Sequence, residues 1–167
     1  LNFIMVLALG SCDQKQEKKK SMRPTDLKEP LIEANKHIVK TEARQISDYL
    51  SRYKWPVKET GSGLKYFIYN KGEGVKAEKG DIVVLEYKVE LITGEEVYNS
   101  LNKGPLKFTV GKGEVISGLE EGILLLRKGD QAKFIIPSHL GYGLLGDQDK
   151  IHPKATLIYD IKLLEIN

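Results

Sequence analysis

Apolar and polar residues alternate along most of the second half of the chain. The clearest case is the segment 81–92, where Val83, Leu85, Tyr87, Val89 and Leu91 alternate with Glu86, Lys88 and Glu90. Such alternation places successive side chains on opposite faces of a β-strand, so this segment is predicted to be a strand with one buried face. Thr93-Gly94 predicts a turn, and residues 95–100 are expected to pair back as a hairpin. The same criterion predicts strands over residues 64–70, 106–110, 132–136 and 155–166.

A longer period, close to that of an α-helix, governs residues 31–53. The apolar positions of this segment fall roughly on one face: Leu31, Ile38, Ile46, Tyr49, Leu50 and Tyr53. We expect a helix of about 20 residues that ends at Trp55-Pro56, because the residue before a proline is pushed out of the α region. Its apolar stripe packs on its own domain, or it pairs with a second copy of the chain or with a client. The pattern leaves these alternatives open.

The stretch from Gly111 to Gly122 combines a loop with a short helix. Val115 and Ile116 lie between glycines at 111, 113 and 118, and apolar residues follow at helical spacing: Ile116, Leu119, Ile123 and Leu126. The helix is expected to stop at Lys128-Gly129, where a cation and a glycine occupy positions usual for a helix C-terminus. One interpretation is a buried joint between strand and helix. The other is the rim of an apolar pocket with an available backbone N–H.

Several antiparallel strands with one short helix inserted late among them indicate an α+β fold. We predict a curved antiparallel sheet wrapped around the short helix, with a pocket between the two, over residues 62–167. An amphipathic helix, assigned to residues 31–55, precedes this domain, and a flexible tether over residues 13–30 precedes the helix. The tether is predicted to be disordered because it lacks apolar periodicity, contains two prolines and is rich in lysine and glutamate.

Residues 1–12 are predicted to be a lipoprotein signal. The run LNFIMVLALGS is apolar and uncharged, and it ends at Cys12, the only cysteine in the chain. It is too short to span a bilayer, which needs about 20 apolar residues. Leu9-Gly10-Ser11-Cys12 resembles the bacterial lipobox, in which the cysteine is lipidated. Because the chain opens on Leu1 without a basic leading segment, we expect it to continue upstream. The alternative for Cys12 is a small buried hydrophobe or a chance cysteine.

Several other classes of site are not supported. A formal net charge of +3 is too small to indicate a nucleic-acid partner. Residues 141–146 satisfy the pattern G-x-G-x-x-G, but no predicted helix or βαβ unit surrounds them, which excludes a dinucleotide site. Further ligands at metal spacing are missing around Asp147, Asp149, His139 and His152. No arrangement of serine, histidine and aspartate stands out, and we expect neither a cofactor nor a metal.

From about Leu64 to Asn167 the chain resembles the FKBP family of peptidyl-prolyl isomerases. The motifs that carry the resemblance are GDIVVLEY, TGEEVYNS, GKGEVISGLEEGILLLRKGDQAKFIIP, the pair Tyr142-Gly143 and HPKATLIYDIKLLEI, in the order and spacing of the family. The lipobox, the preceding helix and the loop YGLLGDQDKI are most similar to a Bacteroidetes lipoprotein branch associated with gliding motility. The resemblance implies an FKBP-like fold and prolyl isomerase activity.

The resemblance also implies which residues form a proline-binding pocket: Tyr87, Val97, Leu106, Phe108, Val115, Ile116, Leu119, Tyr142, Ile151 and Tyr159. In the family, the N–H in the position of Ile116 receives a substrate carbonyl, and the tyrosine in the position of Tyr142 donates a second hydrogen bond. Leu119 replaces a tryptophan of many members, and Val97 replaces a phenylalanine. The spacing of Tyr87, Phe108 and Tyr159 alone favours plain core packing.

Tyr98 is a larger departure, because the family usually has an aspartate there that is linked to activity. A tyrosine hydroxyl can still hydrogen-bond across the pocket, to Tyr87 or Tyr142, but it carries no charge at neutral pH. The leading hypothesis is a lipid-anchored prolyl isomerase of the cell envelope, with a lipid on Cys12 and proline-containing envelope polypeptides as substrates. The alternatives are a binding module with weak or lost turnover and a structural component of an envelope machine. A homodimer through residues 31–53 is compatible with each.

Overall fold

The computed structural model describes residues 24–167. Cys12, the predicted signal and residues 13–23 of the predicted tether lie outside the described residues. The chain divides into two compact units, with the boundary between Lys36 and His37. The first contributes only helical residues to the described part of the chain, and the second contains the sheet.

Helix α1 (Pro24–Tyr53) begins earlier than predicted, so residues 24–30 are helical rather than tether. Proline is favoured in the first helical turn, where its missing N–H has no partner to lose. Pro30 lies inside the helix and removes one backbone donor without ending it. The C-terminal end is as expected, since Tyr53 is the last helical residue before Trp55-Pro56.

The described residues form a seven-stranded antiparallel sheet in the order β1-β2-β6-β7-β3-β4, with β5 also paired to β3. The strands are β1 (Lys58–Glu59), β2 (Lys65–Asn70), β3 (Ile82–Leu91), β4 (Glu96–Asn99), β5 (Leu106–Thr109), β6 (Gln131–Ile136) and β7 (Leu157–Ile166). The strands predicted from alternation are all present, and β1 is additional. The α+β fold class is confirmed.

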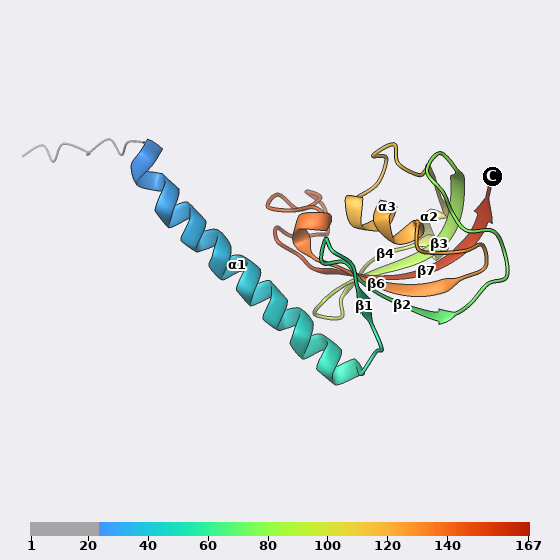
Figure 1. Cartoon of the computed structure of the whole chain (residues 1–167), viewed down its shortest axis with the longest axis horizontal. Helices are drawn as coiled ribbons and strands as arrows, with labels where there is room; N and C mark the ends of the chain where they lie inside the picture. Colours follow the sequence, from blue (N-terminus) through green and yellow to red (C-terminus); the bar gives the residue numbers. More distant parts are fainter. Residues whose placement is uncertain (1–23) are drawn as a thin grey trace, which may run out of the picture. The chain divides into compact units, whose positions relative to one another are not determined.

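Short helices connect the strands. They are α2 (Ser100–Lys103), α3 (Ser117–Ile123) and the 3₁₀ helix η1 (Ser138–Leu140). Helix α3 lies against the sheet (Figure 1). It ends at Ile123 and not at Lys128, because Leu125 and Leu126 donate to carbonyls three residues back, those of Gly122 and Ile123. This tighter turn places Leu126, which has no exposed surface, in the core.

The two faces of the sheet have different coverings. One face packs with α3 in the main hydrophobic cluster, which includes Phe134, Ile136 and Leu157. Their strand neighbours Ile135 and Ile158 form a second cluster, together with Ile46 and Tyr49 of α1. Because neighbouring residues of a strand point to opposite faces, residues 37–53 of α1 cover the reverse face of the sheet. In this part of the helix the apolar stripe packs on its own domain.

Within residues 24–167, no helix combines the length and the apolar character that crossing a bilayer requires.

Candidate active site

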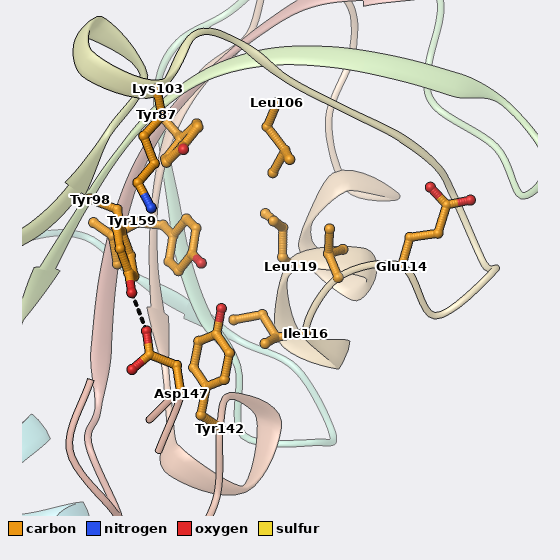
Figure 2. A pocket seen from close by; sticks show the side chains of 12 residues that line it. Tyr87, Tyr98, Lys103, Leu106, Glu114, Ile116, Leu119, Tyr142, Asp147 and Tyr159 are labelled. Carbon is orange, nitrogen blue, oxygen red and sulfur yellow. Dashed lines mark hydrogen bonds between the residues drawn. The ribbon is translucent and has the colours of Figure 1, made fainter. Parts of the chain in front are cut away.

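A pocket of about 340 Å³ lies between the sheet, helix α3 and the loop that follows β6 (Figure 2). Its lining is largely aromatic and aliphatic, with a charged group at three places. The lining residues are Tyr87, Val89, Tyr98, Lys103, Leu106, Glu114, Val115, Ile116, Leu119, Tyr142, Asp147 and Tyr159.

The sheet supplies a row of side chains that crosses neighbouring strands. Val89 of β3 pairs with Tyr98 of β4 on one side and with Tyr159 of β7 on the other. Because directly paired residues point to the same face of a sheet, these side chains form one wall of the pocket. Tyr159 is only 6% exposed, and burial raises the pKa of its hydroxyl. Its hydroxyl therefore stays protonated.

Helix α3 forms the floor, and two of its glycines let it approach the sheet closely. A Cβ atom at Gly118 would lie 2.5 Å from Cγ2 of Ile136, and one at Gly122 would clash with the Phe134 ring. Leu119 lies between these glycines and is 1% exposed, so its side chain forms the pocket floor.

The loop before α3 presents a backbone donor at the pocket. Gly113 has a φ of 71°, and its N–H donates to the Glu120 carboxylate over 2.8 Å, which fixes the loop on the first turn of α3. Ile116 is the N-cap residue, with φ −59° and ψ 145°. Among the described residues no group accepts its N–H, so this donor is available to a ligand. The pocket-rim interpretation of this stretch is therefore supported over the buried joint.

Residues 137–156, here called the Tyr142 loop, close the other side of the pocket. Tyr142 points its hydroxyl into the pocket toward Ile116 (Figure 2). No hydrogen bond occupies this hydroxyl within the described part of the chain, and the ring is 36% exposed. Burial, and then the negative charge of Asp147, raise the pKa of Tyr142. The hydroxyl is consequently a protonated donor throughout the neutral range.

Tyr98 hydrogen-bonds to neither Tyr87 nor Tyr142, the two partners that the sequence left open for it. Its hydroxyl donates to the Asp147 carboxylate (Figure 2) and, over 3.2 Å, to Asp149. The other oxygen of Asp147 accepts the backbone N–H groups of Asp149 and Ile151, at 3.0 and 2.7 Å. Tyr98 thus joins β4 to the Tyr142 loop.

These contacts determine the charge of Asp147. Burial would raise its pKa, but the hydrogen bonds from Tyr98 and from the two backbone N–H groups outweigh burial, and the pKa lies below its usual value. The same contacts act in the opposite direction on Tyr98, whose pKa is raised by burial and by Asp147. The pocket therefore has a fixed negative charge on its wall, next to a neutral tyrosine.

Three residues that the resemblance assigned to the pocket do not line it. Val97, Phe108 and Ile151 are 3%, 3% and 2% exposed and belong to the main hydrophobic cluster. The register of β4 against β3 shifts at Val97, so strict alternation with Tyr98 does not hold there, and the Val97 side chain is buried in this cluster. The other seven residues of that set line the pocket, and so does Tyr98. Their roles in turnover remain predictions.

Four lining residues were not predicted: Val89, Lys103, Glu114 and Asp147. The alternation of β3 already placed Val89 on the face of Tyr87. Lys103 packs its ammonium 4.1 Å from the centre of the Tyr98 ring, a cation–π contact that no sequence pattern indicates.

Over residues 24–167, no group of three or more histidine, cysteine, aspartate or glutamate side chains is placed to bind a metal ion.

Residues 73–164 match the sequence pattern of the family described as FKBP-type peptidyl-prolyl cis-trans isomerase. The chain belongs to this FKBP family. The match includes the strands, the helix and the loop that surround the pocket.

Individual FKBP relatives agree with this assignment. The "Probable FKBP-type peptidyl-prolyl cis-trans isomerase FkpA" of Neisseria meningitidis serogroup B is 47% identical over 111 residues, which are 66% of this chain and 40% of that protein. A "Probable FKBP-type peptidyl-prolyl cis-trans isomerase" of Haemophilus influenzae is 30% identical over 165 residues, 95% of this chain and 68% of that protein. The chain therefore spans less than half the length of the first relative and about two thirds of the second.

A solved FKBP structure shows the same fold. The crystal structure of FkpA from Escherichia coli superposes with a TM-score of 0.68 at 31% identity, covering 88% of this chain and 74% of that one. Both the curved sheet around a short helix and the family resemblance predicted from the sequence are confirmed.

Proposed function

We propose that this chain catalyses cis–trans isomerisation of peptide bonds that precede proline. The observation that carries the proposal is a pocket lined mainly by aromatic and aliphatic side chains with two free donors among its lining residues. These are the Ile116 N–H, which has no acceptor among the described residues, and the Tyr142 hydroxyl, which points into the pocket (Figure 2). The names of its FKBP relatives describe the same reaction. Neither a nucleophile nor a general base is needed for it.

The chemistry follows from the nature of the peptide bond. Rotation about it loses amide resonance and has a barrier of about 18–20 kcal/mol, and uncatalysed exchange at proline takes tens to hundreds of seconds. A twisted amide is less dipolar than a planar one, so an apolar pocket disfavours the planar ground state relative to the twisted state. Leu119 and the Tyr159 ring provide this environment around the prolyl ring.

The two donors hold the substrate chain while the bond rotates. The Ile116 N–H is fixed by the N-terminus of α3, and the Tyr142 hydroxyl is fixed by a separate loop. Contacts on either side of the rotating bond select the twisted form, and selective binding of that form is rate enhancement.

The test is a prolyl isomerisation assay on the full chain and on Tyr142→Phe. We expect clear acceleration by the natural chain and a loss of about three- to tenfold in kcat/KM for the variant, since a hydrogen bond contributes roughly 0.5–1.5 kcal/mol. Peptide binding should weaken less than turnover. Absence of acceleration by the natural chain would contradict the proposal.

The competing function is a binding module that holds chains without turning them over. The observation that favours it is Tyr98, in the position where the family usually has an aspartate. Tyr98→Asp separates the two functions in the same assay. Activity in the natural chain supports the enzyme, whereas activity that arises only in Tyr98→Asp supports the binding module.

For the cellular setting, we propose a lipid anchor on Cys12 and proline-containing envelope polypeptides as substrates. The support is in the sequence: an apolar run, the lipobox-like LGSC and a Lys- and Glu-rich segment after it. Labelling with a palmitate analogue in a bacterial host, with Cys12→Ser as the control, tests the anchor. Label in the natural chain alone supports it, and equal labelling of both chains contradicts it.

Two finer assignments belong to the same proposal. The loop YGLLGDQDKI and the lipobox support placement in the gliding-motility-associated branch of Bacteroidetes lipoproteins.

Apolar side chains of α1 that remain largely exposed, among them Leu31 at 60% and Val39 at 63%, support a homodimer through residues 31–53. Sedimentation of the full chain tests the dimer, which Val39→Glu should weaken.

A further inference from the structure

Glu42 of α1 forms an unusual set of contacts with the Tyr142 loop. Its Oε1 accepts the backbone N–H of Ser138 over 2.6 Å and the hydroxyl of Thr156 over 2.7 Å. Its Oε2 accepts the Ser138 hydroxyl over 3.0 Å. Ser138 opens this loop and Thr156 closes it, so one carboxylate joins both ends of the segment that carries Tyr142.

The contacts continue from Ser138 to the residues on either side of Tyr142. The Ser138 carbonyl accepts the N–H of Gly141 over 3.1 Å and the N–H of Gly143 over 2.8 Å. Gly143 in turn accepts the N–H of Lys154 over 2.7 Å, which draws the two arms of the loop together. A shift of Ser138 is therefore transmitted to the backbone on both sides of Tyr142.

The other donor of the pocket is tied to the same segment. The Ser117 hydroxyl at the start of α3 donates to the Leu140 carbonyl over 3.2 Å, within the turn that Ser138 begins. Ser117 directly follows Ile116. The segment that Glu42 holds thus contacts the structures that present each of the two pocket donors.

We propose that Glu42 is a positioning residue for the isomerase reaction, acting through Ser138 and Thr156 to hold Tyr142 at the pocket. This inference rests on the proposed prolyl isomerase function. Ser138 and Thr156 are only 8% and 2% exposed. Water therefore cannot readily replace the Glu42 carboxylate as the acceptor of their hydrogen bonds. Without Glu42, three buried donors lose their acceptor, and the loop must rearrange to satisfy them.

The alternative is that Glu42 only fastens α1 to the rest of the domain. In that case, weakening the helix packing at another residue should lower kcat/KM as much as replacing Glu42. Ile46 lies one turn further along the same helix, is 4% exposed and packs on Ile135 and Ile158. It fastens the same helix through apolar packing, and its side chain accepts none of the hydrogen bonds that Glu42 accepts from Ser138 and Thr156. Ile46→Ala is therefore the matched control for lost helix packing, and Asp48→Asn, at an exposed position of the helix, is the control for lost charge.

The experiment compares the full chain with Glu42→Ala, Glu42→Gln, Ile46→Ala and Asp48→Asn, each at a temperature where circular dichroism shows it to be folded. Two quantities are measured: kcat/KM for prolyl isomerisation, and the amide hydrogen exchange of Gly141 and Gly143. We expect Glu42→Ala to lose about tenfold in kcat/KM, since a displacement of about 1 Å in a positioning contact can slow a reaction by up to 10²-fold. Exchange at Gly143 should accelerate in parallel.

The controls and the conservative variant determine the interpretation. Glu42→Gln keeps one acceptor and the side-chain volume, so it should recover part of the rate. Ile46→Ala should lower the melting temperature while keeping kcat/KM within about twofold of the natural chain. Natural kcat/KM in Glu42→Ala, or an equal loss in Ile46→Ala, would overturn the inference.

The two measurements distinguish failure of the proposed isomerase function from failure of the proposed role of Glu42. If the natural chain has no turnover, isomerase activity is excluded for it, but exchange at Gly141 and Gly143 still tests whether Glu42 holds the loop. If Glu42→Ala does not fold, Glu42→Gln supplies the comparison, because its amide oxygen can retain the Ser138 N–H. Unchanged exchange in that variant, together with unchanged kcat/KM, would also overturn the inference.

Discussion

At the scale of single residues, Tyr98 and Asp147 act as a pair across the pocket wall. Tyr98 replaces an acidic residue that the family usually places on this strand, and its hydroxyl binds a carboxylate that comes from the Tyr142 loop instead. The negative charge is thus retained near the pocket, although it belongs to a different element. Two backbone N–H groups hold Asp147 in place, so the charge has a defined position.

The lowered pKa of Asp147 predicts how this pair responds to acid. Since its folded-state pKa lies below the usual 3.8, Asp147 stabilises the fold above its unfolded pKa, and this contribution is lost as pH falls through the folded pKa. The difference in melting temperature between the natural chain and Asp147→Asn should therefore be constant from about pH 7 to pH 5 and shrink toward about pH 3.

Asp149→Asn is the comparison for that titration. Asp149 accepts from Tyr98 over the longer distance of 3.2 Å and is exposed, so its replacement should have a smaller effect at every pH. A difference for Asp147→Asn that persists unchanged at low pH would contradict the role of the charge.

The family resemblance placed Tyr87 and Tyr159 in the pocket. Alternation in β3 and β7 predicted only that one face of each strand is buried, because burial of one strand face leaves a local pattern. The bond between Tyr98 and Asp147 links positions 49 residues apart and leaves no such pattern. Val97 was expected in the pocket but is buried in the main hydrophobic cluster, at a position where the register of β4 against β3 shifts.

At the scale of elements, helix α3 can pack close to the sheet because two of its residues are glycines, which have no side chain. Gly118 and Gly122 allow its backbone to approach Ile136 and Phe134 of β6. This close approach sets the position of α3, which forms the floor of the pocket. Glycine and apolar spacing are local signals, and they predicted a short helix after the loop. Its predicted end was wrong because the turn at Leu124–Leu126 is imposed by burial in the core.

Gly122→Ala tests this close approach. The new methyl group would clash with the fully buried Phe134 ring, so we expect a loss of stability of about 1–3 kcal/mol from overpacking, which exceeds the helix-propensity gain of about 1 kcal/mol. Denaturant unfolding measures it. A displaced helix should also lower kcat/KM through Leu119.

The comparison variant is Gly61→Ala, where a Cβ atom would have no neighbour within 4 Å. Its stability should change by less than about 0.5 kcal/mol. An equal effect of the two alanine substitutions would exclude steric contact with β6 as the cause.

At the scale of the whole molecule, the sheet of the second unit has coverings on both faces. Residues 37–53 of α1 pack Ile46 and Tyr49 on Ile135 and Ile158, and Tyr49 forms an aromatic group with Tyr53 and Trp55 at the end of the helix. The amphipathic pattern predicted the helix, but a stripe alone does not identify the surface that it covers.

We predict that this part of α1 and the pocket unfold together. Trp55, the only tryptophan, reports on the helix junction, and near-ultraviolet circular dichroism of the pocket tyrosines reports on the site. Their denaturant midpoints should coincide, because the helix shares a buried cluster with β6 and β7. Tyr49→Ala should lower both midpoints together. A separate early transition of Trp55 would contradict a single cooperative unit.

The contacts of Glu42 also have a consequence for the order in which the molecule is completed. Its partners lie 96 and 114 residues later in the chain. During synthesis from the N-terminus, α1 leaves the ribosome long before Ser138 and Thr156 exist, and its carboxylate remains in water until they arrive. The Tyr142 loop can therefore acquire its final geometry only after nearly all of the sheet has been made. A nascent chain that has not reached Thr156 has no finished pocket.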